Sequence, residues 1–248
     1  MRKLYSCFLL FCLFCGYANA ESILDYDTSD PLYMLHDEDL LSETGIIFAS
    51  SDDSDAMLRV GEALSYGIND RLNIGARVHY QFDFGGDEYG RHENGFSSID
   101  LGGAYRLGRA GDNSAHMISD ALFGLKFGGS SHVRTPWFAD STYYAGLRFG
   151  RQWTGLSLSG TIKSSWIFDD ERGMSYIDFI PEAYFRFVHD IHLGTGLTIR
   201  KSTNPHYNQE WINTKFVAGF GRTQYIGVFD YEFERSEFQL GFKLNILF

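Results

Sequence analysis

Apolar and polar residues alternate along most of the chain. The clearest stretch, 238–248, has a large apolar residue at every even position and polar residues or glycine at the odd positions until Leu247. A period of two places one set of side chains on each face of a strand, whereas a helix would scatter them around its axis. The same alternation recurs at 72–84, 156–168 and 191–200. The pattern therefore predicts amphipathic strands.

The length and chemistry of these runs favour membrane-crossing strands. Several exceed ten residues, whereas soluble strands are most often about five or six residues long, and a tilted strand needs about nine to eleven residues to cross a bilayer. The polar face carries glycine, serine and full charges, which suits a water-filled lumen. Tyr and Phe cluster toward strand ends, for example Tyr143 and Phe179, as the aromatic girdles of a transmembrane barrel would require.

Short and long connections alternate, which predicts the topology. Outer-membrane barrels have short periplasmic turns, longer outer loops and an even number of strands. We therefore predict an all-β fold, a transmembrane antiparallel up-and-down β-barrel of about twelve strands with both ends periplasmic. Ten is the alternative, because the first strand is weak. The short turns are expected at 68–70, 152–154, 189–190 and 222–224, and the longer loops at 85–95, 129–140, 169–175 and 202–209. The strands are expected near 44–51, 55–67, 70–84, 96–107, 116–128, 141–151, 155–168, 176–188, 191–201, 210–221, 225–234 and 237–248.

Two features fit this arrangement badly. The stretch 109–115 would be a long periplasmic turn. Pro181 lies inside a predicted strand, where it removes a ladder donor and should mark an edge or a bulge.

The first twenty residues have the pattern of an export signal. Arg2 and Lys3 precede an apolar core at 4–14, and 18–20 (Ala-Asn-Ala) form a small-x-small cleavage site. The core is too short to span a bilayer as a helix. We predict a signal peptide at 1–20.

The cysteines and the charge narrow the class further. All three cysteines (Cys7, Cys12 and Cys15) lie in the predicted signal peptide, so the mature chain would hold neither a disulfide nor a cysteine metal site. A lipid anchor on Cys12 or Cys15 is the alternative, although bulky Phe11 and Phe14 precede them. The formal net charge of −11 argues against nucleic-acid binding, and aromatics at 17% argue against disorder.

Residues 21–43 form a separate acidic stretch before the predicted barrel at 44–248. They contain eight Asp and Glu residues and no Lys or Arg. Such a stretch is typical of a solvated periplasmic tail. The apolar run 31–35 leaves a second possibility open, in which this segment docks against the periplasmic end of the barrel or enters its interior.

Taken together, the export signal, the cysteine-free amphipathic strands and the terminal Leu247-Phe248 resemble bacterial outer-membrane β-barrel proteins of the porin-like channel class. The phrase at 64–72, Leu-Ser-Tyr-Gly-Ile-Asn-Asp-Arg-Leu, is similar to a hairpin found in many such proteins. The resemblance implies a Gram-negative outer membrane, contact with its lipid and lipopolysaccharide, and a terminal strand whose Phe248 is read by the barrel assembly machinery.

Strand parity predicts which charged side chains face the lumen. Ten basic residues against eight acidic ones would nearly balance there, although the whole chain is acidic. The bland interpretation is a set of cross-strand ion pairs that stiffen the wall; the functional one is a pore whose charge rows orient polar or anionic solutes; a plugged barrel is the third. The basic residues are Arg59, Arg77, Arg106, Lys126, Arg148, Lys163, Arg186, Arg200, Lys215 and Lys243, and the acidic ones are Asp83, Asp100, Asp120, Asp178, Glu182, Asp230, Glu232 and Glu234.

The sequence contains no recognisable catalytic or metal-binding arrangement. None of the eight histidines stands in a His-x-Ser-Asn pattern like that of the barrel phospholipases, and none is spaced convincingly for zinc. We expect no catalytic residue, no cofactor and no metal. Carboxylate clusters in the outer loops could hold divalent cations that bridge lipopolysaccharide phosphates, but solvated loop tips are the simpler explanation. These clusters are Asp52, Asp53 and Asp55; Asp87, Glu88 and Glu93; and Asp169, Asp170 and Glu171.

The leading functional hypothesis is a passive outer-membrane channel for small polar or charged solutes. One alternative is a structural or adhesive surface barrel that displays loops 85–95 and 129–140 without conductance. An outer-membrane enzyme is a weaker alternative. A soluble periplasmic calyx of lipocalin type would instead turn its apolar face inward.

Overall fold

The computed structural model describes residues 27–50, 56–84, 94–112, 115–128, 141–168, 175–188, 190–205, 208–234 and 236–248. The signal peptide predicted at 1–20 and the three acidic loop clusters lie outside these residues. No helix in the described part of the chain is long and apolar enough to cross a membrane.

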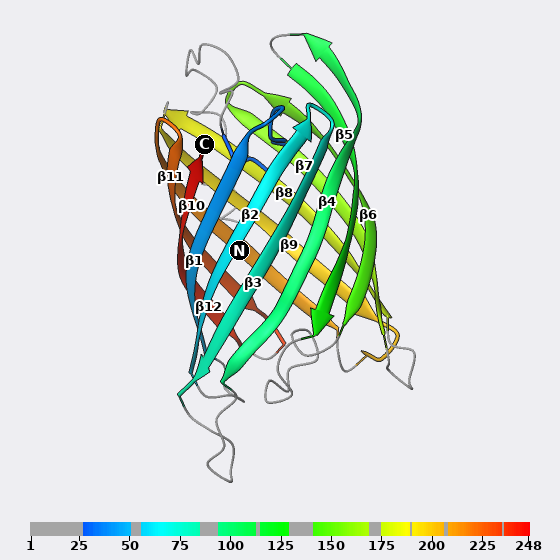
Figure 1. Cartoon of the computed structure of the whole chain (residues 1–248), viewed down its shortest axis with the longest axis vertical. Coiled ribbons are helices and arrows are strands. Elements are labelled where there is room, and N and C mark those ends of the chain that lie inside the picture. The colour runs from blue at the N-terminus through cyan, green and yellow to red at the C-terminus, as the bar shows by residue number, and fades with distance from the viewer. Residues whose placement is uncertain are drawn as a thin grey trace, which may run out of the picture.

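Within the described residues, twelve antiparallel strands form one closed barrel (Figure 1). Each strand pairs with its neighbours in sequence, and the last strand pairs with the first to close the wall. The predicted fold, twelve strands rather than ten, is therefore confirmed. The strands are β1 (Leu40–Ser50), β2 (Met57–Asn69), β3 (Leu72–Asp83), β4 (Gly95–Asp112), β5 (Ala115–Gly128), β6 (Thr142–Trp153), β7 (Leu156–Ile167), β8 (Ser175–Val188), β9 (Ile191–Ser202), β10 (Gln209–Phe220), β11 (Thr223–Glu232) and β12 (Phe238–Leu247).

The alternation along the strands separates an apolar outer face from a polar inner face. On β12, Leu240 and Phe242 are 58% and 50% exposed. On the other face of the same strand, Lys243 and Asn245 point inward, and Asn245 is buried. This orientation is the reverse of a lipocalin-type calyx, because the large apolar side chains surround the barrel instead of filling it. The inner face of the described strands is accordingly mainly polar, and it includes a small apolar cluster of Tyr184, Val217 and Ile226.

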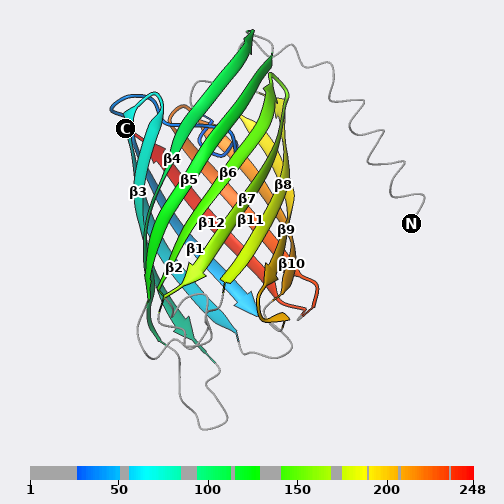
Figure 2. The same ribbon diagram turned by 90° about the vertical axis from the view of Figure 1, so that its right-hand side faces the viewer.

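All the short connections lie at one end of the barrel, together with the start of β1 and the end of β12 (Figures 1 and 2). There Phe248 N donates to Leu40 O at 2.8 Å, which joins the two ends of the barrel sequence. The predicted topology assigns this end to the periplasmic side. We call it the periplasmic end and the opposite one the outer end.

The first strand is longer than expected. It begins at Leu40 rather than at residue 44, and Leu40 and Leu41 already pair with Tyr66 and Leu247. The predicted boundary between the acidic segment and the barrel, 43/44, therefore falls inside β1. The reason is that Ser42, Glu43 and Thr44 complete the ladder despite their polarity.

The predicted long turn at 109–115 is wrong. Residues 109–112 continue β4, and the β4–β5 ladder extends to the pair Asp112 and Ala115. A register shift between Arg106 and Gly108 lets this hairpin continue. Bulges of this kind bend and twist a hairpin without ending it.

Pro181 lies within β8 and is neither at an edge nor at a bulge. It pairs with Gly160 of β7, whereas the pairing with β9 is interrupted between Phe179 and Glu182. The register is the same on both sides of this gap. Because Pro has no N–H to donate, the ladder tolerates it by omitting pairs on one side of the strand.

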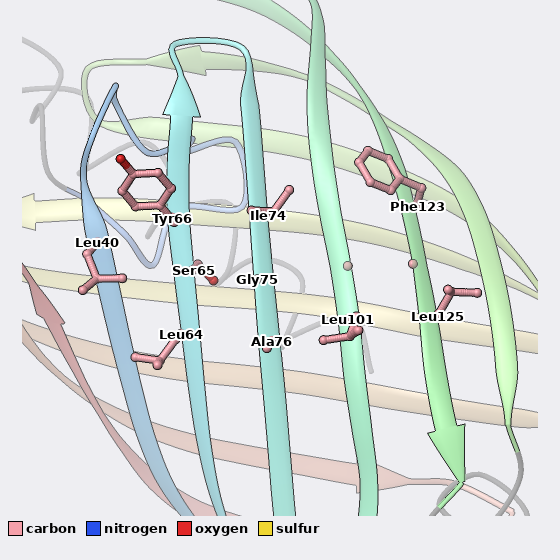
Figure 3. Close-up of a pocket in the computed structure, with 12 residues that line it drawn as sticks. Leu40, Leu64, Ser65, Tyr66, Ile74, Gly75, Ala76, Leu101, Phe123 and Leu125 are labelled. Carbon is pink, nitrogen blue, oxygen red and sulfur yellow. The ribbon is translucent and has the colours of Figure 1, made fainter.

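The outer face over β1 to β5 contains a shallow apolar depression of about 510 Å³ (Figure 3). Leu64, Tyr66, Leu101 and Phe123 are among the exposed side chains that line it. Glu62 lies one position along the same face of β2 and accepts hydrogen bonds from Ser42 Oγ, at 2.7 Å, and Thr44 Oγ1. These hydroxyls satisfy a carboxylate on a face that is mainly apolar.

Candidate functional site: the charged lumen

The predicted lumen residues alternate with the exposed apolar side chains of the same strands, which puts them on the inner face. This holds for the basic set and for Asp83, Asp100, Asp120, Asp178, Glu182, Asp230 and Glu232. Glu234 is the exception, because β11 ends at Glu232 and Glu234 is exposed beyond it. Glu43, which was assigned to the acidic segment, takes a place on the wall instead.

Asp120 of β5 forms one ion-paired group with two arginines on the neighbouring strands. It is directly opposite Arg106 of β4 and Arg148 of β6 in the register. Arg106 Nε and Arg148 Nη2 each lie 2.6 Å from one of its carboxylate oxygens. Asp120 is fully buried. Such charge-assisted hydrogen bonds are the strong ones, and here they satisfy a carboxylate that water cannot reach.

Asp178 of β8 repeats this arrangement three strands further along the sheet. Its register partners are Lys163 of β7 and Arg200 of β9. Arg200 Nε lies 2.6 Å from Asp178 Oδ1, and Lys163 Nζ lies 3.4 Å from Oδ2. Arg200 also lies over the ring of Tyr176, with its Cζ 4.1 Å from the ring centroid. One carboxylate again joins two cations.

Glu43 of β1 is shared by Arg77 and Lys243, but this group is open to solvent. The N–O distances are 3.1 and 3.2 Å, and the Arg77 side chain is 45% exposed. A space of about 90 Å³ in the lumen wall is lined by these three residues together with Arg59 and His79. Charged groups here can contact water and solutes.

We call residues 27–39 the N-terminal segment. Its first part, 27–35, lies inside the lumen at the periplasmic end, whereas 36–38 are exposed (Figures 1 and 2). Asp27, Asp30, Leu32, Met34 and Leu35 are all buried. The segment makes side-chain contacts to strands on every side of the barrel before it continues into β1. It therefore crosses the lumen rather than hanging into the periplasm.

Asp27 is held by donors from three strands. Tyr184 Oη and Gln224 Nε2 donate to Asp27 Oδ1 at 2.8 and 3.0 Å. Arg186 Nε donates to Oδ2 at 3.0 Å, and His192 Nδ1 lies 3.2 Å from the same oxygen. Burial alone would raise the pKa of Asp27, but the hydrogen bond and charge of His192 and the charge of Arg186 lower it to about 2.

Asp30 contacts the same arginine through a different nitrogen, Nη2. Its Oδ2 accepts hydrogen bonds from Gln152 Nε2 at 2.8 Å, from Ser157 Oγ at 2.7 Å and from Arg186 Nη2. Its Oδ1 accepts from the N–H of Leu32 at 2.8 Å, which closes a turn in the segment. Arg186 therefore bridges the two carboxylates.

The remainder of the segment is fixed by carbonyl contacts, apolar packing and one close backbone approach. Lys215 Nζ donates to Ser29 O at 2.7 Å, and Arg106 Nη2 donates to Leu32 O at 2.9 Å. Near β1, Gly67 exchanges backbone hydrogen bonds with Glu38 and Asp39. A Cβ at Gly67 would overlap the carbonyl oxygen of His36, so only glycine permits this crossing.

The sequence indicated that the segment could enter the barrel but did not identify Asp27 and Asp30 as the residues that bind there. Tyr184, His192, Gln152 and Gln224 were also missed, because only charged lumen residues were singled out. The sequence contained one signal for Asp27 and Asp30. The predicted lumen face carries ten basic and eight acidic residues, and two carboxylates from elsewhere in the chain could balance this difference.

In the part of the chain that the structure describes, no three His, Cys, Asp or Glu side chains are grouped so as to hold a metal ion. The divalent-cation sites considered for the outer loops lie outside that part.

No family model and no curated protein sequence matches this chain. Solved structures do. An outer-membrane channel from Pseudomonas putida F1 described as COG4313 is 11% identical, with a TM-score of 0.66, over 88% of this chain and 98% of that one.

Two porins have similar folds. KdgM, solved in complex with disordered oligogalacturonate, is 11% identical with a TM-score of 0.58, over 82% of this chain and 98% of its own. The NanC porin is 10% identical with a TM-score of 0.62, over 83% and 98%. At these identities the likeness concerns the fold, and the chain has the closed twelve-stranded barrel fold of the small outer-membrane channels.

Proposed function

We propose that the protein is a passive outer-membrane channel for small polar or charged solutes. The observation that carries this proposal is the segregation of charge: ion-paired groups line the inner face of strands whose outer face is apolar. Rows of charged side chains around an aqueous passage orient and select solutes. The fold neighbours named as channels and porins support the proposal, and the oligogalacturonate in KdgM supports it at the level of a polar solute.

The proposal includes how the protein reaches its membrane. Residues 1–20 act as a cleaved signal peptide. The last strand, which ends in Phe248, is recognised by the barrel assembly machinery. The exposed apolar face then contacts outer-membrane lipid, with lipopolysaccharide at the outer end. Replacing Phe248 with Ala should reduce the amount of barrel recovered in outer-membrane fractions, whereas an unchanged yield would contradict a role in assembly.

Planar-bilayer recordings of the refolded protein test conduction directly. We expect unitary current steps, and their absence at every voltage, from the native chain and from a chain with Asp27→Ala and Asp30→Ala alike, would contradict the channel. Neutralising Arg77, Arg148 and Arg200 together should weaken any preference for anions. An unchanged ion preference would show that these side chains do not line the path.

A second candidate is a structural or adhesive barrel without conductance. One observation favours it: the N-terminal segment crosses the lumen at the periplasmic end. The two candidates separate in a comparison of the native chain with a chain that carries Asp27→Ala and Asp30→Ala. Current that appears or grows in this variant favours a channel restricted by the segment. Silence in both chains favours the structural barrel.

A further inference from the structure

The donors around Asp27 and Asp30 belong to the barrel wall. Tyr184 and Arg186 come from β8, His192 from β9, and Gln224 from β11. Each strand is fixed in the closed ladder by its two neighbours. The donor positions therefore depend on the barrel rather than on the segment, and such preorganised donors bind anions well.

The carboxylates, in contrast, belong to a short stretch that the ladder does not hold. The backbone hydrogen bonds between the segment and the wall strands occur at Gly67, where the chain approaches β1. Residues 27–32 are held by side-chain donors from the wall, including Lys215 and Arg106 on their carbonyl oxygens. This stretch can leave without breaking any strand pairing.

The wall around the two carboxylates is rich in cationic and neutral donors. Arg186 contacts both Asp27 and Asp30, and Lys215 Nζ lies 5.2 Å from the centroid of the Tyr184 ring in the same region. Without the segment, these cations would face the lumen with Gln152, Ser157, His192 and Gln224 around them. An arginine flanked by hydroxyl and amide donors is suited to recognise carboxylates.

We infer that this cluster is a carboxylate-binding site of the lumen, and that Asp27 and Asp30 are its tethered occupants. The ligand class is a solute with two carboxylate groups, which displaces residues 27–30 and binds to Arg186 through its Nε and Nη2, the nitrogens that now contact Asp27 and Asp30. This inference rests on the proposed channel, since it places a solute site on the path. A tethered ligand has an effective concentration of about millimolar, so free solute competes only at or above that range.

Calorimetric titration of the refolded full chain tests the site. Succinate is the probe, succinamide the uncharged control and acetate the single-carboxylate comparison. The Asp27→Ala, Asp30→Ala chain should bind succinate, acetate more weakly and succinamide undetectably. Adding Arg186→Gln should weaken succinate binding at least tenfold. Adding Arg151→Gln instead, which removes an exposed cation from the outer face of β6 near the same end, should leave it unchanged.

Failure to bind succinate, equal binding of succinamide, or insensitivity to Arg186→Gln would overturn the site. A second measurement covers poor folding of the double variant. In a chain that begins at residue 21 and so lacks Cys7, Cys12 and Cys15, Ser29→Cys should react with maleimide faster in excess succinate than in excess succinamide, because the buried Ser29 position becomes accessible. Equal rates would count against displacement.

The same samples separate this site from the channel itself. Succinate binding without unitary current would contradict the channel and support the site. If the double variant conducts current, does not bind succinate and is not blocked by it, the site is contradicted and the channel is supported.

Discussion

Two regions of the lumen pair their charges in different surroundings. Around the N-terminal segment, Asp27 and Asp30 are 2% and 4% exposed and Arg186 is 6% exposed. In the second region, Glu43 pairs with Arg77, and their side chains are 21% and 45% exposed. A buried charge that loses its partner is strongly destabilising, whereas an exposed pair contributes little. The first region holds a piece of chain in place, and the second keeps charge available to water.

The largest effect that this contrast predicts is that of Arg186→Ala. It leaves two buried carboxylates without their shared cation, which should weaken docking of the segment by about 3–5 kcal/mol. The segment should leave while the barrel stays closed, since Arg186 is not required by the ladder. Maleimide reactivity of Ser29→Cys measures the release, and heat-modifiable gel mobility reports the barrel.

Arg151→Ala is the control for that experiment and should leave the reactivity low. Continued protection of the cysteine in the Arg186→Ala chain would mean that the other contacts of the segment are sufficient without the arginine.

The next effect concerns apolar packing in the same region. Leu32 is 1% exposed, and Leu32→Ala should weaken docking by about 3 kcal/mol through lost burial and the cavity left behind. Leu240→Ala, on the exposed outer face, is the matched change. The same cysteine assay should respond to the first substitution and not to the second. Equal responses would show that Leu32 packing is irrelevant to docking.

Acid should release the segment through Asp27. Its pKa is about 2 in the docked state against an ordinary value of 3.8, so its contribution is complete above about pH 4 and is lost as the pH falls toward 2. The shift corresponds to about 2 kcal/mol. Protonated Asp27 no longer attracts Arg186 and His192, and it cannot accept from all of the donors that it faces, which include Tyr184 and Gln224.

Hydrogen exchange of residues 27–39, corrected for intrinsic rates, measures this release between pH 5 and 2.5. The rise in exchange should be smaller in Asp27→Asn, because that position no longer titrates. An identical rise in both chains would show that Asp27 is not the group that responds to acid.

The smallest effect on stability is expected at the exposed group. Arg77→Gln should change the free energy of unfolding by less than about 1 kcal/mol, because solvent screens the pair with Glu43. Urea unfolding in lipid vesicles measures this, and the reversal potential in a salt gradient measures ion preference. A large loss of stability would show that the Arg77–Glu43 pair contributes as much as the buried pairs do, which would contradict the contrast between the two regions.

The period-two pattern was sufficient to predict all twelve strands, because apolar and polar residues alternate wherever lipid and water lie on opposite faces. It failed where local polarity hides a strand. Ser42 and Glu43 look like the acidic leader, yet the outward hydroxyl of Ser42 binds Glu62, and Glu43 binds Arg77 and Lys243. Those contacts depend on which strands become neighbours.

Parity also placed the charged lumen residues on the wall, but it could not pair them with the segment. Asp27 and Arg186 are 159 positions apart in sequence, and no local pattern relates them. Neutral donors such as Gln224 carry no charge signal at all. The site became visible only when the closed barrel brought β8, β9 and β11 around the same point.

The crossing of the lumen also constrains the order of assembly. Asp27 meets Tyr184, Arg186 and Gln224, which lie 157, 159 and 197 residues further along the chain. These partners do not surround a common space until most of the wall exists. The residues exported first are thus among the last to reach their final positions. Docking of this segment requires a wall that is already nearly closed.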